Sequence, residues 1–245
     1  MLKYTDEEKI DFGQKFGFAK SSDFNKLYHQ YNMNFLKLLA NKINKQQPKI
    51  ADYGGGNGII SSALTGILKR KNIKDFKIDI IDLDSSKFIG NPYIRNIKSD
   101  VLAYNKKEYY DFSISRFLMH YFIEKEKKEF FMNVYNNLKE SGYFLLINWV
   151  IDDIQTLRLK SEILGLIQNF REIKPRSIPT SANLIENAKK AGFKIERKMK
   201  VSYTISLDDF YRNRFNLTRQ EINMIKNKVK TTEHKELQIA LLLKK

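Results

Sequence analysis

The sequence predicts an α/β protein with one open, mostly parallel β-sheet that is covered by helices on both faces. Three observations lead to this fold class. Short apolar runs alternate with segments in which apolar residues recur at helical spacing, as strands and helices do in α/β proteins. Residues 49–82 have the length of a strand–helix–strand crossover. Residues 143–151 are almost continuously apolar, which is typical of a strand covered on both faces.

The size and composition of the chain fit one domain. Of its 245 residues, 42% are hydrophobic and 29% are charged, which is enough for a single sizeable core. We expect a helical N-terminal cap over residues 1–46 and one main domain over residues 47–245. No apolar run approaches the roughly 20 residues of a membrane span, and the N-terminus lacks the apolar stretch of a signal peptide. The sequence therefore predicts a cytoplasmic protein that does not enter membranes.

An amphipathic helix is predicted from about residue 24 to residue 43. Its apolar positions follow the helical period and are Leu27, Tyr28, Tyr31, Phe35, Leu38, Leu39 and Ile43. Ser21, Ser22 and Asp23 precede it as candidate N-caps. Such a helix needs another surface on which to bury its apolar face, so we interpret it as part of a cap on the α/β body.

Strands of the first half of the main domain are predicted at residues 49–53, 76–82, 93–97 and 110–115. Between the first two, apolar residues recur at helical spacing from Ile59 to Leu68, which predicts a helix. The fourth strand alternates, with Phe112 and Ile114 on its inner face. This order of elements is that of successive parallel crossovers.

The second half continues the alternation. It is predicted to contain helices at residues 124–139, 154–170 and 181–191, and strands at residues 143–151, 193–205 and 237–243. Ser141 and Gly142 are expected to end the first of these helices, and Gly192 the third, because glycine is common just past the end of a helix. Residues 207–230, before the last strand, are expected to form a polar helical insert.

Four of the 11 glycines stand within five residues, in the segment Asp52-Tyr-Gly-Gly-Gly-Asn-Gly58. This segment lies between the first predicted strand and the helix that follows it. Glycines let the backbone approach a ligand closely, and open α/β sheets bind ligands at the carboxyl ends of their strands. The sequence therefore predicts a ligand-binding loop.

The spacing of the loop excludes two nucleotide-binding motifs. The pattern G-x-G-x-x-G, counted from Gly54, requires a third glycine at position 59, which is isoleucine. No Gly-Lys-Ser/Thr follows, as a P-loop requires. What remains is Asp52 two positions ahead of a G-x-G-x-G run. A carboxylate there repels a pyrophosphate but suits a cationic ligand with an α-amino group, such as S-adenosylmethionine.

These residues resemble motif I of class I S-adenosylmethionine-dependent methyltransferases. The resemblance extends over roughly residues 48–205. It implies a Rossmann-like fold with seven strands in the order 3-2-1-4-5-7-6, the seventh antiparallel. It is closest to the small-molecule branch, which has DxGGGxG in this loop and Leu-His after the fourth strand. No Asn/Asp-Pro-Pro-Tyr follows that strand, which argues against the branches that methylate adenine and cytosine.

The resemblance also implies which residues bind the cofactor. Asp82 looks like the carboxylate that takes both ribose hydroxyls, and we prefer it to Asp84 because apolar residues directly precede it. Asp100 and Val101 look like the turn that contacts adenine. The whole expected set is Asp52, Tyr53, Gly54, Gly56, Gly58, Asp82, Leu83, Asp100, Val101 and Arg116.

The acceptor side of the site is expected after the fourth strand. His120 is the candidate catalytic residue there, as a general base or a hydrogen-bond donor. Candidate acceptor-lining residues are Tyr28, Tyr31, Tyr121 and Trp149, each with a core role as the alternative. The resemblance implies in-line methyl transfer to an oxygen or nitrogen atom of a small-molecule acceptor, with S-adenosylmethionine as cofactor and no metal. The chain departs from the branch in its short cap and in the insert at 207–230.

Two other functions stay open. The net charge is +16, which favours an RNA methyltransferase, yet 34 of the 44 basic residues are lysine and only 10 are arginine, the preferred reader of phosphates and bases. Nucleic acid is therefore the less favoured partner. The third hypothesis is a non-catalytic protein that binds the cofactor as a scaffold. With no cysteine and three scattered histidines, disulfides, thiolate zinc sites and cysteine nucleophiles are excluded.

Overall fold

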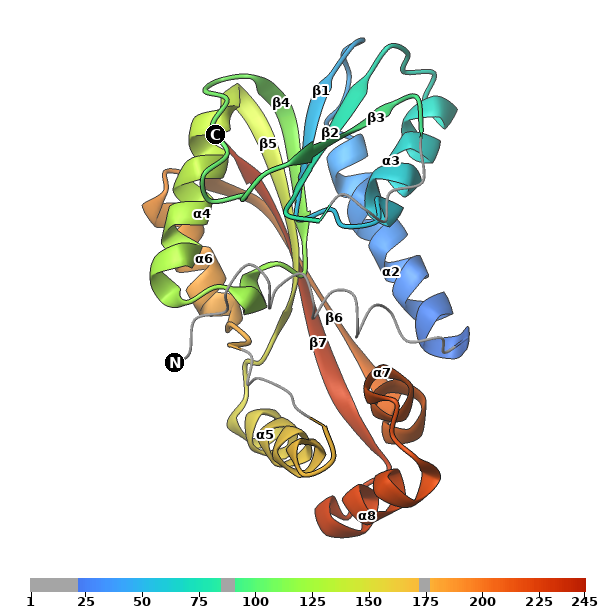
Figure 1. Cartoon of the computed structure of the whole chain (residues 1–245). Helices are drawn as coiled ribbons and strands as arrows, with labels where there is room; N and C mark the ends of the chain where they lie inside the picture. Colours follow the sequence, from blue (N-terminus) through green and yellow to red (C-terminus); the bar gives the residue numbers. More distant parts are fainter. Residues whose placement is uncertain (1–21, 85–90, 172–176) are drawn as a thin grey trace.

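The computed structural model describes residues 22–84, 91–171 and 177–245. They form one seven-stranded sheet in the order β3-β2-β1-β4-β5-β7-β6 (Figure 1). The pairs among β1 to β5 are parallel, and β7 is antiparallel to both of its neighbours. The predicted fold class and strand order are confirmed. The strands are β1 (Lys49–Tyr53), β2 (Lys77–Asp82), β3 (Ile94–Lys98), β4 (Tyr110–Arg116), β5 (Leu138–Val150), β6 (Lys194–Ser206) and β7 (Glu233–Lys244).

Helices cover both faces of the sheet. The α-helices are α2 (Ser22–Ala40), α3 (Ile59–Arg70), α4 (Glu124–Asn137), α5 (Ile154–Gln168), α6 (Ser181–Lys190), α7 (Asn213–Phe215) and α8 (Arg219–Val229). Figure 1 shows α4 and α6 beside one face, α2 and α3 beside the other, and α5, α7 and α8 around the far end of β6 and β7. In the ranges that the structure describes, none of the helices combines the length and apolar composition of a bilayer crossing.

Each strand contributes to two cores, because successive side chains point to opposite faces of a sheet. In β1, Ile50 belongs to the core under α2, α3, α5 and the insert, whereas Ala51 and Tyr53 belong to the core under α4 and α6. Full burial of one large apolar side chain contributes about 1.5–3 kcal/mol, so both cores stabilise the sheet. The sheet in turn aligns the carboxyl ends of its parallel strands along one edge.

The start of β5 differs from the prediction. Helix α4 ends at Asn137, and Ser141 and Gly142 lie inside β5 rather than at a helix end. Pairing with β4 shifts register there, and Ser141 has a φ of 60°. A Cβ on Gly142 would lie 2.8 Å from the carbonyl oxygen of Lys139. The Ser-Gly pair therefore forms a bulge in a strand. Bulges and helix ends favour the same residue types, because both often contain a residue in the left-handed backbone conformation.

The insert at 207–230 is helical as expected, and it also buries an apolar side that the prediction did not include. It consists of a π-turn (Asp208–Arg212), α7 and α8. Its buried apolar side chains are Leu207, Phe210, Tyr211, Phe215, Leu217, Ile222 and Ile225. Because these residues are distributed over three short elements with different axes, they follow no single period in the sequence. The insert packs on α5 and extends the core of that face.

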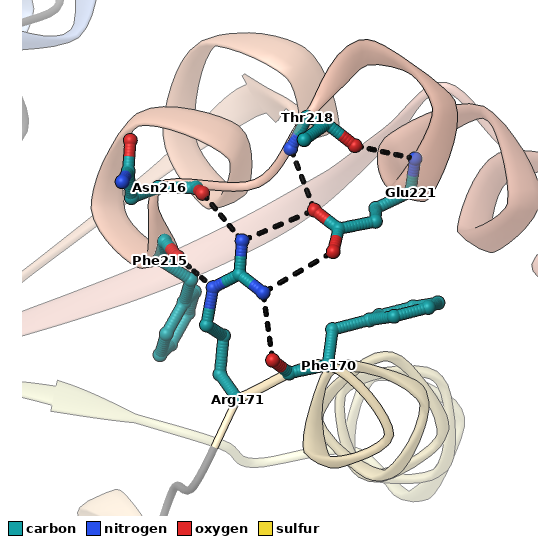
Figure 2. A network of polar contacts seen from close by, with 6 residues as sticks. All are labelled: Phe170, Arg171, Phe215, Asn216, Thr218 and Glu221. Atoms are coloured by element: carbon teal, nitrogen blue, oxygen red, sulfur yellow. Dashed lines mark hydrogen bonds and ion pairs between the residues drawn. The ribbon is translucent and has the colours of Figure 1, made fainter.

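Arg171, just beyond the end of α5, holds the insert in place (Figure 2). Its Nε donates to the carbonyl of Phe215 at 3.1 Å, and its Nη2 donates to the carbonyl of Asn216 at 2.7 Å. Nη1 and Nη2 each donate to one carboxylate oxygen of Glu221 at 3.1 Å. Glu221 also completes a capping box with Thr218 at the start of α8. One guanidinium thus joins α5 to the end of α7 and the beginning of α8.

Replacing Arg171 by alanine is expected to destabilise the protein by about 1.5–3 kcal/mol, because charge-assisted and bidentate bonds are lost and carbonyls at the end of α7 lose their donors. Arg171→Lys should recover only part of this loss, since an ammonium cannot form the fork. Arg158→Ala, an exposed arginine of α5, is the control and should change stability by less than about 0.5 kcal/mol. Urea unfolding measures all three. Equal stabilities of Arg171→Ala and Arg158→Ala would contradict this role.

Candidate functional site

The glycine loop leaves β1 at the carboxyl edge of the sheet. Gly54, Gly56 and Gly58 have φ values of 70°, 53° and 78°, in the left-handed region that favours glycine. A Cβ on Gly54 would lie 2.9 Å from Cδ1 of Leu118, whereas a Cβ on Gly56 would meet nothing within 4 Å. The loop is therefore packed against the segment after β4 at its start and open at its middle, where a ligand can approach the backbone.

Asp82, at the end of β2, lies across this opening. Its Oδ2 accepts a hydrogen bond from the backbone N–H of Gly56 at 2.8 Å, and its Oδ1 accepts one from the N–H of Asp84 at 2.9 Å. Burial raises the pKa of Asp82, and the two backbone donors oppose that rise. Each carboxylate oxygen has further acceptor capacity, so the group can still accept from two hydroxyls of a ligand.

Asp52 lies beneath the loop and is 1% exposed. Its Oδ2 accepts a bond of 2.6 Å from Oγ of Ser61 in α3. A Cβ on Gly55 would lie 2.8 Å from Cγ of Asp52, so the loop covers the carboxyl group. Burial raises its pKa to about 6, against the effects of Ser61 and of the positive charge of Arg116. In this geometry Asp52 supports the loop from below, and the loop separates its carboxyl group from the space above the loop.

The other predicted cofactor residues divide into two groups. Tyr53 and Val101 are buried in the core under α4, with the Tyr53 hydroxyl accepting from Asn137 at 3.1 Å, so only their backbone is available to a ligand. Asp100 lies in the turn after β3, and its Oδ1 accepts from the N–H of Leu102 at 2.9 Å. Leu83, Asp100 and Arg116 form the second group and are partly exposed. Arg116 ends β4 at the same edge of the sheet.

An aromatic cluster lies at the carboxyl ends of β4 and β5. It consists of Tyr31, Phe117, His120, Tyr121, Trp149 and Tyr203. The rings of Phe117 and Trp149 are 4.6 Å apart, and the Trp149 Nε1 donates to the hydroxyl of Tyr203 at 2.9 Å. Phe117 has a φ of 54°, a costly conformation for a bulky residue, which indicates a segment constrained by its surroundings.

The cluster brings together most of the candidate acceptor residues. His120 is 4% exposed, and its ring lies 4.3 Å from that of Tyr121 and 6.5 Å from that of Trp149. Tyr31 joins from α2 by stacking on Tyr203 at 6.0 Å. Tyr28 belongs to α2 as well, but its side chain lies outside the described residues.

Sequence reasoning missed Tyr203 and Phe117. Tyr203 lies in β6, far from any motif, and only the strand order together with its partner Trp149 identifies it. Phe117 directly follows Arg116, the last residue of β4. That position, next to the carboxyl end of the fourth strand, could have identified it. Among the residues that the structure describes, no group of three or more His, Asp or Glu side chains is arranged to hold a metal ion.

No protein-family model matches the sequence, and no curated protein sequence matches it significantly. Solved structures do match. A candidate methyltransferase from Bacillus halodurans has a TM-score of 0.67 at 14% identity, covering 86% of this chain and 98% of its own. A candidate sarcosine dimethylglycine methyltransferase from Galdieria sulphuraria has a TM-score of 0.61 at 13% identity, covering 98% and 97%.

A third similar structure is a complex. It is geranyl diphosphate C-methyltransferase from Streptomyces coelicolor with Mg²⁺, geranyl diphosphate and S-adenosyl-L-homocysteine, with a TM-score of 0.53 at 12% identity, covering 93% of this chain and 86% of its own. At these identities the similarity establishes the fold. The sheet order and the structural matches agree on the Rossmann-like arrangement that the resemblance implies.

Proposed function

We propose that this chain, which has the class I methyltransferase fold, transfers a methyl group from S-adenosylmethionine to an oxygen or nitrogen atom of a small-molecule acceptor. The observation that carries the proposal is the pairing of an open glycine loop with a carboxylate across it. Gly56 has free space above its Cα, and its N–H is bonded to Asp82 on the next strand. This is a suitable arrangement for a ligand with a vicinal diol.

The residues present fit S-adenosylmethionine. Asp82 would accept from the ribose hydroxyls, and the turn at Asp100 and Val101 would border the adenine. Asp52 places a negative charge beneath the loop. That charge would stabilise the cationic α-amino group of the cofactor above it. Arg116, at the end of β4, would bind the carboxylate of the cofactor. When bound, the cofactor supplies an electrophilic methyl group on a positively charged sulfur.

On the acceptor side, this chain's own residues position the nucleophile and exclude water. In-line displacement depends mainly on holding the reacting atoms close and aligned, which a rigid aromatic wall favours. His120 lies in that wall beside Trp149 and would take a proton where the acceptor has to lose one. α2 carries Tyr31 to the same cluster, and we assign residues 1–46 the role of a cap over the main domain at 47–245.

The similar structures support a small-molecule acceptor. Their names include sarcosine dimethylglycine and geranyl diphosphate, two acceptors of very different chemistry, and one of the structures holds S-adenosyl-L-homocysteine. The acceptor of this chain must therefore be read from its own residues.

Calorimetric titration of the nucleic-acid-free protein with S-adenosylmethionine and S-adenosylhomocysteine tests the proposal. We expect both to bind in the micromolar range, with one site per chain. Absence of binding by a folded protein would contradict it. Nucleic acid that copurifies with the protein and binds with a steep dependence on salt would favour the RNA alternative, in agreement with the net charge of +16.

A further inference from the structure

Three alternate residues of β7, His234, Glu236 and Gln238, form a polar row on the face that carries α2, α5 and the insert. Their side chains are buried, with exposures of 5%, 2% and 0%. We call them the β7 row. Glu236 Oε1 lies 2.5 Å from Nζ of Lys160 in α5, and 2.9 Å from Nε2 of His234. Gln238 Nε2 donates a long bond of 3.4 Å to Asn32 in α2.

The hydrogen-bonding capacity of this row is not used up. Among the described residues, Oε1 of Gln238 and Nδ1 of His234 have no hydrogen-bond partner. Glu236 is engaged in the row by Lys160 and His234, both of which contact its Oε1. A buried polar atom without a partner costs about 1–3 kcal/mol, and a buried ion pair is a poor source of stability. Stability alone therefore does not explain a polar row in this core.

The row lies next to the aromatic cluster of the site. Gln238 is the register partner of Trp149 in β5, and Glu236 is that of Tyr203 in β6. Directly opposite residues of an antiparallel pair have their Cβ atoms about 4.5–5.5 Å apart. Trp149 in turn contacts Phe117, which follows β4 and the cofactor side. The row is thus one strand away from the position assigned to the acceptor.

The free atoms of the row are acceptors. Oε1 of Gln238 is an acceptor in every state, and Nδ1 of His234 is one when Nε2 carries the hydrogen that it shares with Glu236. Burial acts to raise the pKa of Glu236, but Lys160 and His234 outweigh it and lower that pKa to about 2. The carboxylate and Lys160 neutralise each other, so the row offers no excess positive charge to an anionic group.

From this placement we infer that the β7 row recognises a hydrogen-bond-donating group, a hydroxyl or an amine, on an acceptor whose flat or apolar body packs on Trp149 and Tyr203. The inference rests on the proposed function, since it names the class of acceptor for that site. It makes Gln238 and His234 specificity-determining residues, and it disfavours acceptors that present a carboxylate or phosphate to this row.

Four probes that share a phenyl ring on a short alkyl chain test it, namely 2-phenylethanol, phenethylamine, ethylbenzene and 3-phenylpropionate. Each is titrated by ligand-observed NMR into the full chain, with and without S-adenosylhomocysteine. We expect the alcohol or the amine to bind at least about fivefold more tightly than ethylbenzene, the effect of one hydrogen bond. Comparing the affinities of 2-phenylethanol and phenethylamine then shows whether the row prefers a hydroxyl or an amine.

Gln238→Leu should abolish that preference and leave the affinity for S-adenosylhomocysteine unchanged. Because it removes a buried amide with an unmet acceptor, it should also preserve or raise the melting temperature, and Gln238→Met offers a second shape if leucine does not fold. Gln220→Leu, an exposed glutamine of α8, is the matched control.

Several outcomes would overturn the inference. The first is tighter binding of 3-phenylpropionate than of the alcohol and the amine. The second is a preference for the alcohol or amine over ethylbenzene that persists in Gln238→Leu. The third is no binding of any probe at millimolar concentration, in which case the row holds only water. Failure of the proposed function gives a different result, because S-adenosylhomocysteine then does not bind the wild-type protein.

Discussion

Asp82→Ala is expected to weaken S-adenosylmethionine binding by about tenfold or more, because a charged acceptor that takes hydrogen bonds contributes about 1.5–3 kcal/mol. Two effects act together. The carboxylate that would accept from the ribose is lost, and so is the bond of 2.8 Å that holds the N–H of Gly56. Asp82→Asn, which retains one acceptor oxygen, should lie between the wild type and the alanine variant.

Calorimetry of the three proteins measures the effect, with the melting temperature recorded for each. Glu129→Ala removes an exposed carboxylate from α4 that is not among the residues assigned to the site, and it is the control for the change in net charge. Its cofactor affinity should equal that of the wild type. An unchanged affinity in a folded Asp82→Ala variant would remove Asp82 from the site.

Asp52→Asn is expected to stabilise the protein and to weaken cofactor binding. Burial raises the pKa of Asp52 from 3.8 to about 6, so the folded state keeps a proton that the unfolded chain releases at lower pH. Stability is therefore lost as the pH rises from about 4 to about 6, and a deficit of about 3 kcal/mol is complete above that range. Asparagine cannot ionise and can still accept from Ser61, so the variant should gain about 1–3 kcal/mol near neutral pH.

Urea unfolding at about pH 7.5 and at about pH 4 checks the sign of this effect. The variant should be more stable than the wild type at the higher pH and nearly equal to it at the lower pH, where Asp52 of the wild type is protonated. A variant that is less stable at the higher pH would show that the ionised carboxylate contributes more through its contacts than its burial costs.

Cofactor affinity should change with pH in the opposite direction to stability. The negative charge of Asp52 beneath the loop favours a cationic ligand, so wild-type affinity is expected to fall as the pH is lowered through about 6, and the Asp52→Asn variant should bind several-fold more weakly at neutral pH with a flatter profile. Parallel pH profiles for the two proteins would exclude this role of the charge.

The fold and the glycine loop could be predicted because their signals are local. The period of apolar residues identifies helices and strands, and right-handed crossovers leave few ways to order parallel strands. Three residues of one turn have left-handed backbone, which favours glycine at 54, 56 and 58, and Asp82 ends the next strand. The same local reasoning placed the end of α4 two residues too late, since a Ser-Gly pair serves a helix end and a strand bulge equally well.

The proposed acceptor side was only partly predictable, because its residues come from distant segments. Tyr31, Trp149 and Tyr203 lie in α2, β5 and β6 and meet only after β7 has inserted between β5 and β6. Arg171 carries no motif, and its bonds reach 50 residues along the chain to Glu221.

By itself the sequence determined the α/β class, the strand order expected from its resemblance, the glycine loop and the carboxylate across it. Only the tertiary structure decided that Asp52 lies under the loop, that the insert is apolar on one side, and that β7 presents a buried polar row beside Trp149. The physical reason is that burial and cross-strand register arise from contacts between segments remote in the chain. Such contacts leave no periodic pattern in the order of the residues.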